Sequence, residues 1–241
     1  MKKILSFSLL LLTASPLLAA DAKTDVTSAA AALGSQKNYS WKTTVEVGNN
    51  SRFKPGPTEG KTEKDGYTTL TMTFNDNTSE AVIKGTNAAI KTPDNGWQSA
   101  AEAIADGNGG GGFNPAMFIA RTVQNFKTPA LDAAKLADET KDLKAGTNGI
   151  SGDLTENVVK STLTFRRGGN NGGDGPTVTN PKGSVTFWVA DGKLVKYQYH
   201  VTGTVSFNGN DREVDRTTTT EIKDVGTTKI EVSDEAKKKL E

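Results

Sequence analysis

Few residues of this sequence could take part in chemistry. His200 is the only histidine, and there is no cysteine. A general base needs a nucleophile and an orienting carboxylate within hydrogen-bond distance, and here the nucleophile would have to be a serine or threonine that no motif marks. His200 stands on the polar side of an alternating stretch, so we expect a solvated strand residue. One histidine without cysteines leaves mainly carboxylates as zinc ligands, and no metal site is expected.

Two glycine-rich stretches, residues 105–112 and 168–175, have the composition of ligand-binding loops but lack the motifs. Neither contains G-x-x-x-x-G-K-[ST], and neither has the aspartate spacing and distal glutamate of a calcium loop. We therefore expect flexible loops and no cofactor.

Arg166-Arg167 is interpreted as a solvated basic pair. The alternating charges of 211–216 are interpreted as cross-strand pairs on a sheet.

Hydrophobic residues are the better candidates for a functional site. A mid-chain set at helical spacing, which includes Trp97, Met117, Phe118 and Phe126, has more apolar surface than one sheet face needs. Helices and sheet then either form a filled core or enclose an apolar cavity, and the sequence leaves both open. The residues expected to line such a cavity are Trp41, Leu70, Met72, Phe74, Trp97, Met117, Phe118, Tyr197 and Tyr199.

The beginning of the chain is typical of a secretory signal peptide. Two lysines precede an apolar run over residues 4–18 and a short alanine-rich stretch. Residues 1–20 are expected to be removed, with cleavage after Ala22 as the alternative. A transmembrane anchor is the competing interpretation, but the run is short and contains Ser, Thr and Pro. Without a cysteine to carry a lipid, we expect a periplasmic or secreted protein that does not span a membrane after cleavage.

Charge excludes one class of partner. The whole chain has a formal net charge of +1, and loss of Lys2 and Lys3 leaves 27 basic against 28 acidic residues. Binding to a polyanion needs a surplus of Lys and Arg, so no nucleic acid is expected as a partner. A protein partner cannot be named from the sequence.

A long β-meander over residues 184–232 dominates the predicted fold. Asp191-Gly192 separates two runs of β-branched and aromatic residues, which predicts a type I′ hairpin turn. After this turn, alternation places one apolar set on a buried face. That set is Val195, Tyr197, Tyr199, Val201, Val205 and Phe207.

The remaining elements follow from periodicity and punctuation. Strands are expected over 38–47, 67–74, 78–84 and 87–92, and again over 142–144, 150–154 and 158–165. Helices are expected over 25–33, 97–106, from Pro115 onward, from Pro129 to Ala137, and over 233–240. Thr24 is expected to cap the first of these. Asn114 is expected to cap the helix that begins at Pro115, with Phe113 as its hydrophobic staple. Residues 48–66 and 166–183 are predicted to be long exposed connections or loops.

This order of elements predicts an α+β fold, because strands and helices are segregated rather than alternating. We expect a curved antiparallel sheet, a half β-barrel, with a helical lid inserted between two strand groups. One domain is expected over residues 23–241, with the helical insertion at about 97–138.

Short segments of the chain resemble the LolA/LppX-like half-barrel proteins of the bacterial envelope. They are an N-terminal helix entering a Tyr39-x-Trp41 strand, the helical insertion, the segment from Gly149 to Thr155, and the ending W-V-A-D-G-K-L-V-K-Y followed by D-V-G-T-T-K-I-E-V. The resemblance implies a half barrel whose concave face is closed by helices, with an apolar ligand between them. No position matches a carrier's functional arginine.

These observations give three functional hypotheses. The first is a non-enzymatic exported protein that binds a lipid or another hydrophobic small molecule under the helices. The alternative is an envelope interaction or scaffold protein with a filled core and functional surface loops at 48–66 and 166–183. A hydrolase is the third, and it would require a serine or threonine nucleophile.

Overall fold

The computed structural model describes residues 18–48, 55–74, 77–107, 114–164 and 175–241. Residues 1–17, Phe113, Phe165, Arg166-Arg167 and most of the two glycine-rich stretches lie outside these ranges. The elements are α1 (Leu18–Gly34), β1 (Asn38–Val47), β2 (Pro55–Glu63), β3 (Thr68–Phe74), β4 (Asn77–Lys84), β5 (Asn87–Thr92), β6 (Asn95–Ser99), α2 (Ala100–Gly107), α3 (Pro115–Gln124), α4 (Pro129–Asp138), β7 (Thr140–Gly146), β8 (Gly149–Leu154), α5 (Glu156–Leu163), β9 (Thr177–Ala190), β10 (Lys193–Phe207), β11 (Asn210–Lys223) and α6 (Asp234–Lys238).

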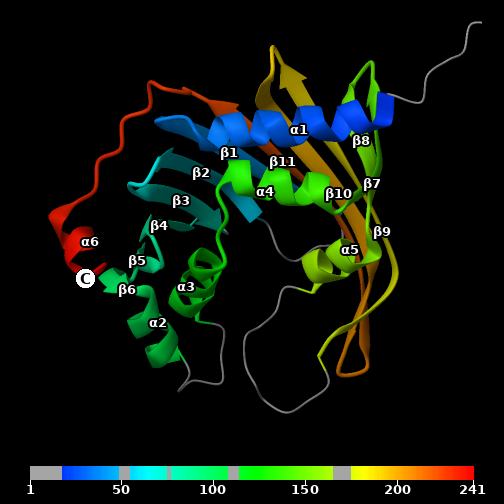
Figure 1. The fold of residues 1–241 in the computed structure, drawn as a ribbon. Helices are drawn as coiled ribbons and strands as arrows, with labels where there is room; N and C mark the ends of the chain where they lie inside the picture. The colour runs from blue at the N-terminus through cyan, green and yellow to red at the C-terminus, as the bar shows by residue number, and fades with distance from the viewer. Residues whose placement is uncertain (1–17, 49–54, 75–76, 108–113, 165–174) are drawn as a thin grey trace, which may run out of the picture.

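All strands join one antiparallel sheet in the order β6-β5-β4-β3-β2-β1-β11-β10-β9-β8-β7. The sheet is curved and open, since its two edge strands, β6 and β7, do not pair with each other (Figure 1). Helices α2, α3 and α4 follow β6 and precede β7, so they separate the two strand groups. The predicted α+β half barrel with inserted helices is confirmed.

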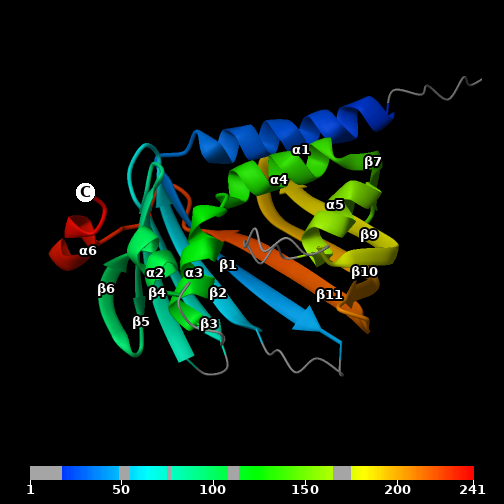
Figure 2. The ribbon, with the colours of Figure 1, turned by 90° about the horizontal axis from the view of Figure 1, so that it is seen from below.

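Helices α1, α3, α4 and α5 lie on one face of the sheet, which we call the inner face (Figures 1 and 2). The main hydrophobic core lies between these helices and the sheet, and it includes residues from both strand groups. A second, small cluster lies on the opposite, outer face, where Ala236 of α6 packs with Val82 and Ala89. Neighbouring side chains on a strand point to opposite faces, so Ala81 and Ile90 belong to the inner core.

Several predicted elements are confirmed at their boundaries. Asp191 and Gly192 both have positive φ, 50° and 71°, as a type I′ turn requires. Asn114 caps α3 through its side chain, which accepts a hydrogen bond from the Met117 amide, and Pro115 occupies the first turn. The staple proposed for Phe113 lies outside the described residues.

The predicted strand over 158–165 is wrong, because residues 156–163 form helix α5. The β-branched residues of this stretch suggested a strand, but Thr155 precedes the helix in an extended conformation, and Glu156 forms a 3.1 Å ion pair with Lys160 one turn later. Glycines in the sheet make space for the helix. A Cβ at Gly183 would come within 2.7 Å of a Val159 methyl, and one at Gly203 equally close to Leu163.

Two predicted loops contain strands, and the first strand group is larger than predicted. Strand β2 occupies Pro55–Glu63 between β1 and β3, and β9 begins at Thr177. Strand β2 and the first half of β9 were missed because prolines, glycines and charges removed their alternation. Trp97 is in strand β6, and the helix predicted from that residue begins at Ala100.

The predicted buried face of the meander is correct in its centre and wrong at both ends. Tyr197 and Val201 are buried, but Val195 is 41% exposed because a bulge between Leu194 and Lys196 turns Leu194 inward instead. Phe207 is 46% exposed, since it stands at the tip of the β10–β11 hairpin.

At the N-terminus, α1 begins at Leu18, so Thr24 lies inside the helix and not at its cap. Alanine has the highest helix propensity, which explains why the helix extends through the alanine-rich segment. Both predicted cleavage positions therefore fall within the first turns of α1.

Candidate functional site

Trp41 is at the centre of the inner face and is 4% exposed. Its indole ring lies across β2 at Gly60, where any Cβ would collide with the ring. The ring stacks on Phe126 at a centroid distance of 5.9 Å and lies 5.7 Å from the ring of Tyr39. Glycine at position 60 is therefore what lets a tryptophan lie flat on the sheet beneath the end of α3.

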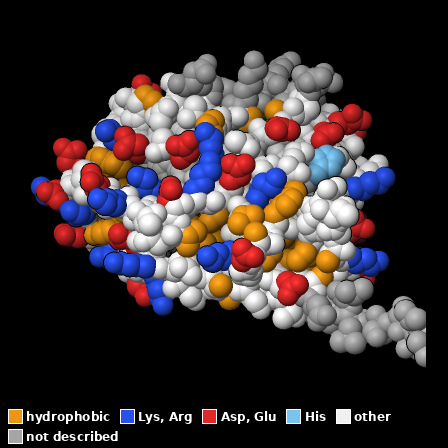
Figure 3. Space-filling view, turned by 90° about the horizontal axis from the view of Figure 1, so that it is seen from above, with side chains coloured by type: hydrophobic (Ala, Val, Ile, Leu, Met, Phe, Trp, Pro, Cys, Tyr) orange, Lys and Arg blue, Asp and Glu red, His pale blue; other side chains and the backbone are white. Residues whose placement is uncertain are grey.

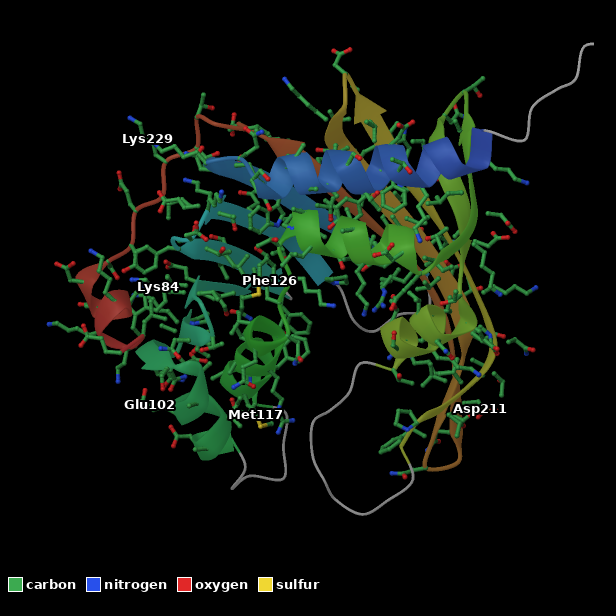
Figure 4. All side chains as sticks on the ribbon, in the orientation of Figure 1. Lys84, Glu102, Met117, Phe126, Asp211 and Lys229 are labelled. Carbon is green, nitrogen blue, oxygen red and sulfur yellow. The ribbon has the colours of Figure 1, made fainter. Side chains whose placement is uncertain are left out.

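Apolar side chains continue from Trp41 toward α3. Leu70 and Met72 are buried, whereas Phe74 and Phe118 are only half-buried, with their ring centroids 6.1 Å apart. Met117 is also half-buried, and its side chain packs against Gly107 at the end of α2. Figure 4 shows Met117 and Phe126 at opposite ends of α3. The predicted lining residues on this side are thus near one another, with Met117 between the helices.

On the other side of Trp41 the inner face becomes polar. The Tyr197 hydroxyl donates a 2.9 Å hydrogen bond to Asp132 Oδ2 of α4, and the hydroxyls of Thr43 and Thr220 are 2.9 Å apart. Burial raises the pKa of Asp132, an effect that the hydrogen bond from Tyr197 and the charge of Lys127 partly offset. Burial likewise raises the pKa of Tyr197 well above its usual value, and the Asp132 charge adds to this shift.

Tyr199 and Arg216 extend the polar region toward α5. Tyr199 is half-buried, and burial raises the pKa of its hydroxyl, while the nearby Arg216 charge lowers it. Arg216 Nη2 donates a 2.7 Å hydrogen bond to the Thr162 carbonyl of α5. Arg216 was missed as a site residue because the alternating charges of 211–216 were interpreted as cross-strand pairs on the sheet. The alternation of Val214, Arg216 and Thr218 was the signal that could have placed it inward.

Trp97 is separated from the other predicted lining residues. It packs in the outer cluster with Val82, Ala89 and the C-terminal helix, on the far side of the sheet. Eight of the nine residues therefore belong to the inner side of the sheet or its helices, and Trp97 does not. Strand alternation gave no direction for the Trp97 side chain, because this residue was predicted to lie in a helix.

The helices pack on the flanks of the inner face. Helix α3 packs on β4 and β5, whereas α5 packs on β9 and β10, and α1 on β7, β9 and β10. Among the described elements, no helix packs comparably closely on the central strands β3, β2, β1 and β11, which are visible between α3 and α5 in Figure 2. The central part of the inner face therefore carries half-buried side chains, notably Val45, Val47, Phe74 and Tyr199.

The outer face has a cleft of about 960 Å³ between strands β1–β5 and the C-terminal segment 223–235. Its charged lining is balanced. The basic residues are Lys42, Lys61, Lys91, Lys223 and Lys229, and the acidic residues are Glu59, Glu80, Asp224, Glu231 and Glu235. Lys42 forms a 2.8 Å ion pair with Glu59 across two strands. Figure 4 shows Lys229 on the C-terminal segment that borders this cleft.

His200 is on the outer face, as predicted. Its Nε2 lies 2.8 Å from Asp215 Oδ1, and its cross-strand neighbour on β9 is Ser184. Asp215, His200 and Ser184 therefore stand on three adjacent strands. Within the described residues no hydrogen bond joins His200 to Ser184, and the imidazole nitrogen that would serve a nucleophile in a triad is already paired with Asp215. This arrangement does not support the hydrolase hypothesis.

Other features of the described residues bear on metals and membranes. No group of three or more His, Asp or Glu side chains there could hold a metal ion. None of the helices in the described part of the chain is long and apolar enough to cross a bilayer. Figure 3 shows acidic and basic side chains interspersed on the face seen from above, with no large area of one sign.

Comparisons with known proteins give similar structures only. No family model matches the chain, and no curated protein matches its sequence. Solved structures that match include the lipoprotein LppX of Mycobacterium tuberculosis, with a TM-score of 0.48 and 11% identity over 89% of this chain and 99% of that chain. LprF of Mycobacterium bovis matches with a TM-score of 0.45 and 12% identity over 91% and 99%. Both matches are likenesses of overall structure at low sequence identity.

Proposed function

We propose that this protein is exported and binds a lipid or another hydrophobic small molecule on the inner face of its sheet, without catalysing a reaction. The observation that carries the proposal is the central part of that face. Tyr39 and Trp41 of β1 and Thr218 and Thr220 of β11 are covered, but farther along these strands Val45, Val47 and Val214 remain half-buried, as does Tyr199 on β10. Apolar surface that protein does not fully cover is favourable for an apolar ligand, at about 25 cal/mol per Å² of area removed from water.

The proposed contact residues lie on both sides of Trp41. Phe74 and Phe118 stand on the α3 side, and Tyr199 stands on the α5 side. Trp41, Leu70, Met72 and Tyr197 are buried in this structure, so they form the floor beneath those half-buried residues. Met117 contributes through the packing of α2 on α3. Trp97 is left out because it belongs to the outer cluster.

Two measurements test the proposal. Organic extraction of the purified protein followed by mass spectrometry should release a lipid, and a fluorescent lipid analogue should bind to the delipidated protein. Val45→Trp places a large side chain on the inner face of β1 and should weaken probe binding at least about tenfold, a loss of about 1.4 kcal/mol. Thr44→Trp adds the same bulk on the outer face of the same strand and is the matched control.

The proposal fails if the extract is empty and the probe does not bind. It fails equally if Thr44→Trp weakens binding as much as Val45→Trp, because the site would then not be on the inner face. In either case the alternative function gains support, namely a scaffold or interaction protein with a filled core. The 960 Å³ cleft on the outer face is the observation that favours this alternative.

A further inference from the structure

Arg216 occupies an unusual position in the sheet. It stands on β11 opposite Val47 of β1 and Val201 of β10, with Thr218 next to it on the same face. Fifteen residues occupy the inward positions of three adjacent strands. They are Tyr39, Trp41, Thr43, Val45 and Val47 on β1, Val214, Arg216, Thr218, Thr220 and Ile222 on β11, and Tyr197, Tyr199, Val201, Gly203 and Val205 on β10. Arg216 is the only charged side chain among these fifteen.

The partners of Arg216 do not account for its charge. Its Nη2 donates to the Thr162 carbonyl, near the C-terminal end of α5, where the helix dipole favours a cation. Its Nε is buried and has no hydrogen-bond partner. No carboxylate of the described residues forms an ion pair with it, and Asp215 points to the outer face toward His200. Arg216 is half-buried, and of the five N–H donors of its guanidinium only one donates a hydrogen bond within the described residues. A partly buried charge without a paired carboxylate is unfavourable.

The surroundings of Arg216 combine apolar side chains with a single cation, as a site for an amphiphile would. Val47, Val201 and Val214 lie next to it on the inner face, and the half-buried Tyr199 lies on the neighbouring strand. The planar guanidinium group of an arginine can donate two parallel hydrogen bonds to the paired oxygens of a carboxylate or phosphate. The apolar central face and this single cation together would suit a chain with one anionic end.

We propose that Arg216 binds the anionic group, a carboxylate or phosphate, of an amphiphilic ligand whose apolar part lies along the central inner face. This inference rests on the proposed function, since it names the class of ligand for the same site. It also assigns the ligand an orientation, with its charged end near α5 and its apolar end toward α3.

The test compares charged and neutral probes of equal length. A fluorescently labelled long-chain fatty acid, its methyl ester and the corresponding alkyl phosphate are titrated into delipidated protein. The unsubstituted protein should bind the acid or the phosphate about tenfold more tightly than the ester, which corresponds to about 1.4 kcal/mol. Whether the acid or the phosphate binds more tightly then identifies the anionic group.

Three variants make the result specific to Arg216. Arg216→Gln should lose the preference for the anionic probes while binding the ester as before, and Arg216→Lys should retain part of the preference because it keeps the charge. Lys193→Gln removes one exposed positive charge at the other end of β10 and should change nothing. Ester binding by Arg216→Gln also shows that this variant is folded.

The outcomes separate the two proposals. If none of the probes binds to the unsubstituted protein, the proposed function fails. If all three bind with equal affinity, or if Arg216→Gln keeps the preference for the anionic probes, the inference about Arg216 fails while the hydrophobic site stands.

Discussion

The two faces of the sheet around Trp41 and Trp97 differ in how their side chains are arranged. On the inner face, Trp41 lies flat over Gly60 and stacks on Phe126, with almost no charge on the strands around it. On the outer face, Trp97 helps line a cleft of about 960 Å³ whose lining includes five basic and five acidic residues. The size of this cleft does not by itself indicate a site for an apolar ligand, because its lining is strongly charged.

The same comparison bears on what each face contributes to stability. Inner-face side chains are buried among helices from several parts of the chain, so their loss leaves cavities. Outer-face charges remain in water, where an ion pair contributes little.

The largest effect is expected for the two tryptophans. Trp41→Ala should lower the free energy of unfolding by about 3–5 kcal/mol, because it empties the space between Gly60 and Phe126. Trp97→Ala should cost clearly less, since that side chain is only half-buried. Urea unfolding followed by circular dichroism measures both. Equal losses would show that the outer cluster is as important to the fold as the inner core.

An intermediate, pH-dependent effect is expected at Asp132. Its pKa is raised by burial, so the folded protein holds this proton more tightly than the unfolded chain does. The contribution of Asp132 to stability is therefore greatest below its unfolded pKa, near 4, and falls as pH rises through the higher folded value. Asp132→Asn should gain stability relative to the unsubstituted protein as the pH is raised from 3 to 7.

Thermal unfolding of both proteins across this pH range measures the effect. Asp138→Asn removes a negative charge from an exposed position at the end of the same helix and serves as the control. A stability difference between the Asp132 variant and the unsubstituted protein that stays constant from pH 3 to 7 would contradict the prediction.

The smallest effect is expected at the outer ion pair of Lys42 and Glu59. Both side chains are exposed, and Lys42→Ala should change the free energy of unfolding by less than about 1 kcal/mol. The Lys42 charge lowers the pKa of Glu59, so the small contribution is present at neutral pH and is lost as Glu59 becomes protonated in acid. A double-mutant cycle with Glu59→Ala measures it, and a coupling of several kcal/mol would show that the outer cleft is less solvated than its exposure indicates.

Local signals in the sequence were sufficient for much of the fold. The Asp191-Gly192 turn, the Asn114-Pro115 helix start and the alternation of Tyr197 with Tyr199 each depend on neighbours within a few residues. Prediction failed where distant packing decided the outcome. Residues 156–163 became a helix because Gly183 and Gly203 leave room for it, and β2 became a strand because β1 and β3 flank it.

For the candidate site, sequence patterns found most of the apolar residues but missed the cation. Hydrophobic residues at strand and helix spacing point inward in nearly every fold, so Trp41, Leu70 and Tyr197 could be selected from alternation alone. Arg216 could not be recognised in the same way, because charged residues on strands usually face water. Its alternation with Val214 and Thr218 is compatible with an inward direction, and its pairing with Val47 and Val201 establishes that direction.

Turns, caps and periodicity are local properties of the chain, so sequence patterns were enough to predict the antiparallel α+β character, the position of the inserted helices and the set of apolar residues. The tertiary structure was needed to show that Trp97 faces outward, that Arg216 faces inward, and that Val45 and Val47 are only half-buried on the inner face. Those features depend on strand register and on helix packing between segments far apart in sequence, which no local pattern encodes.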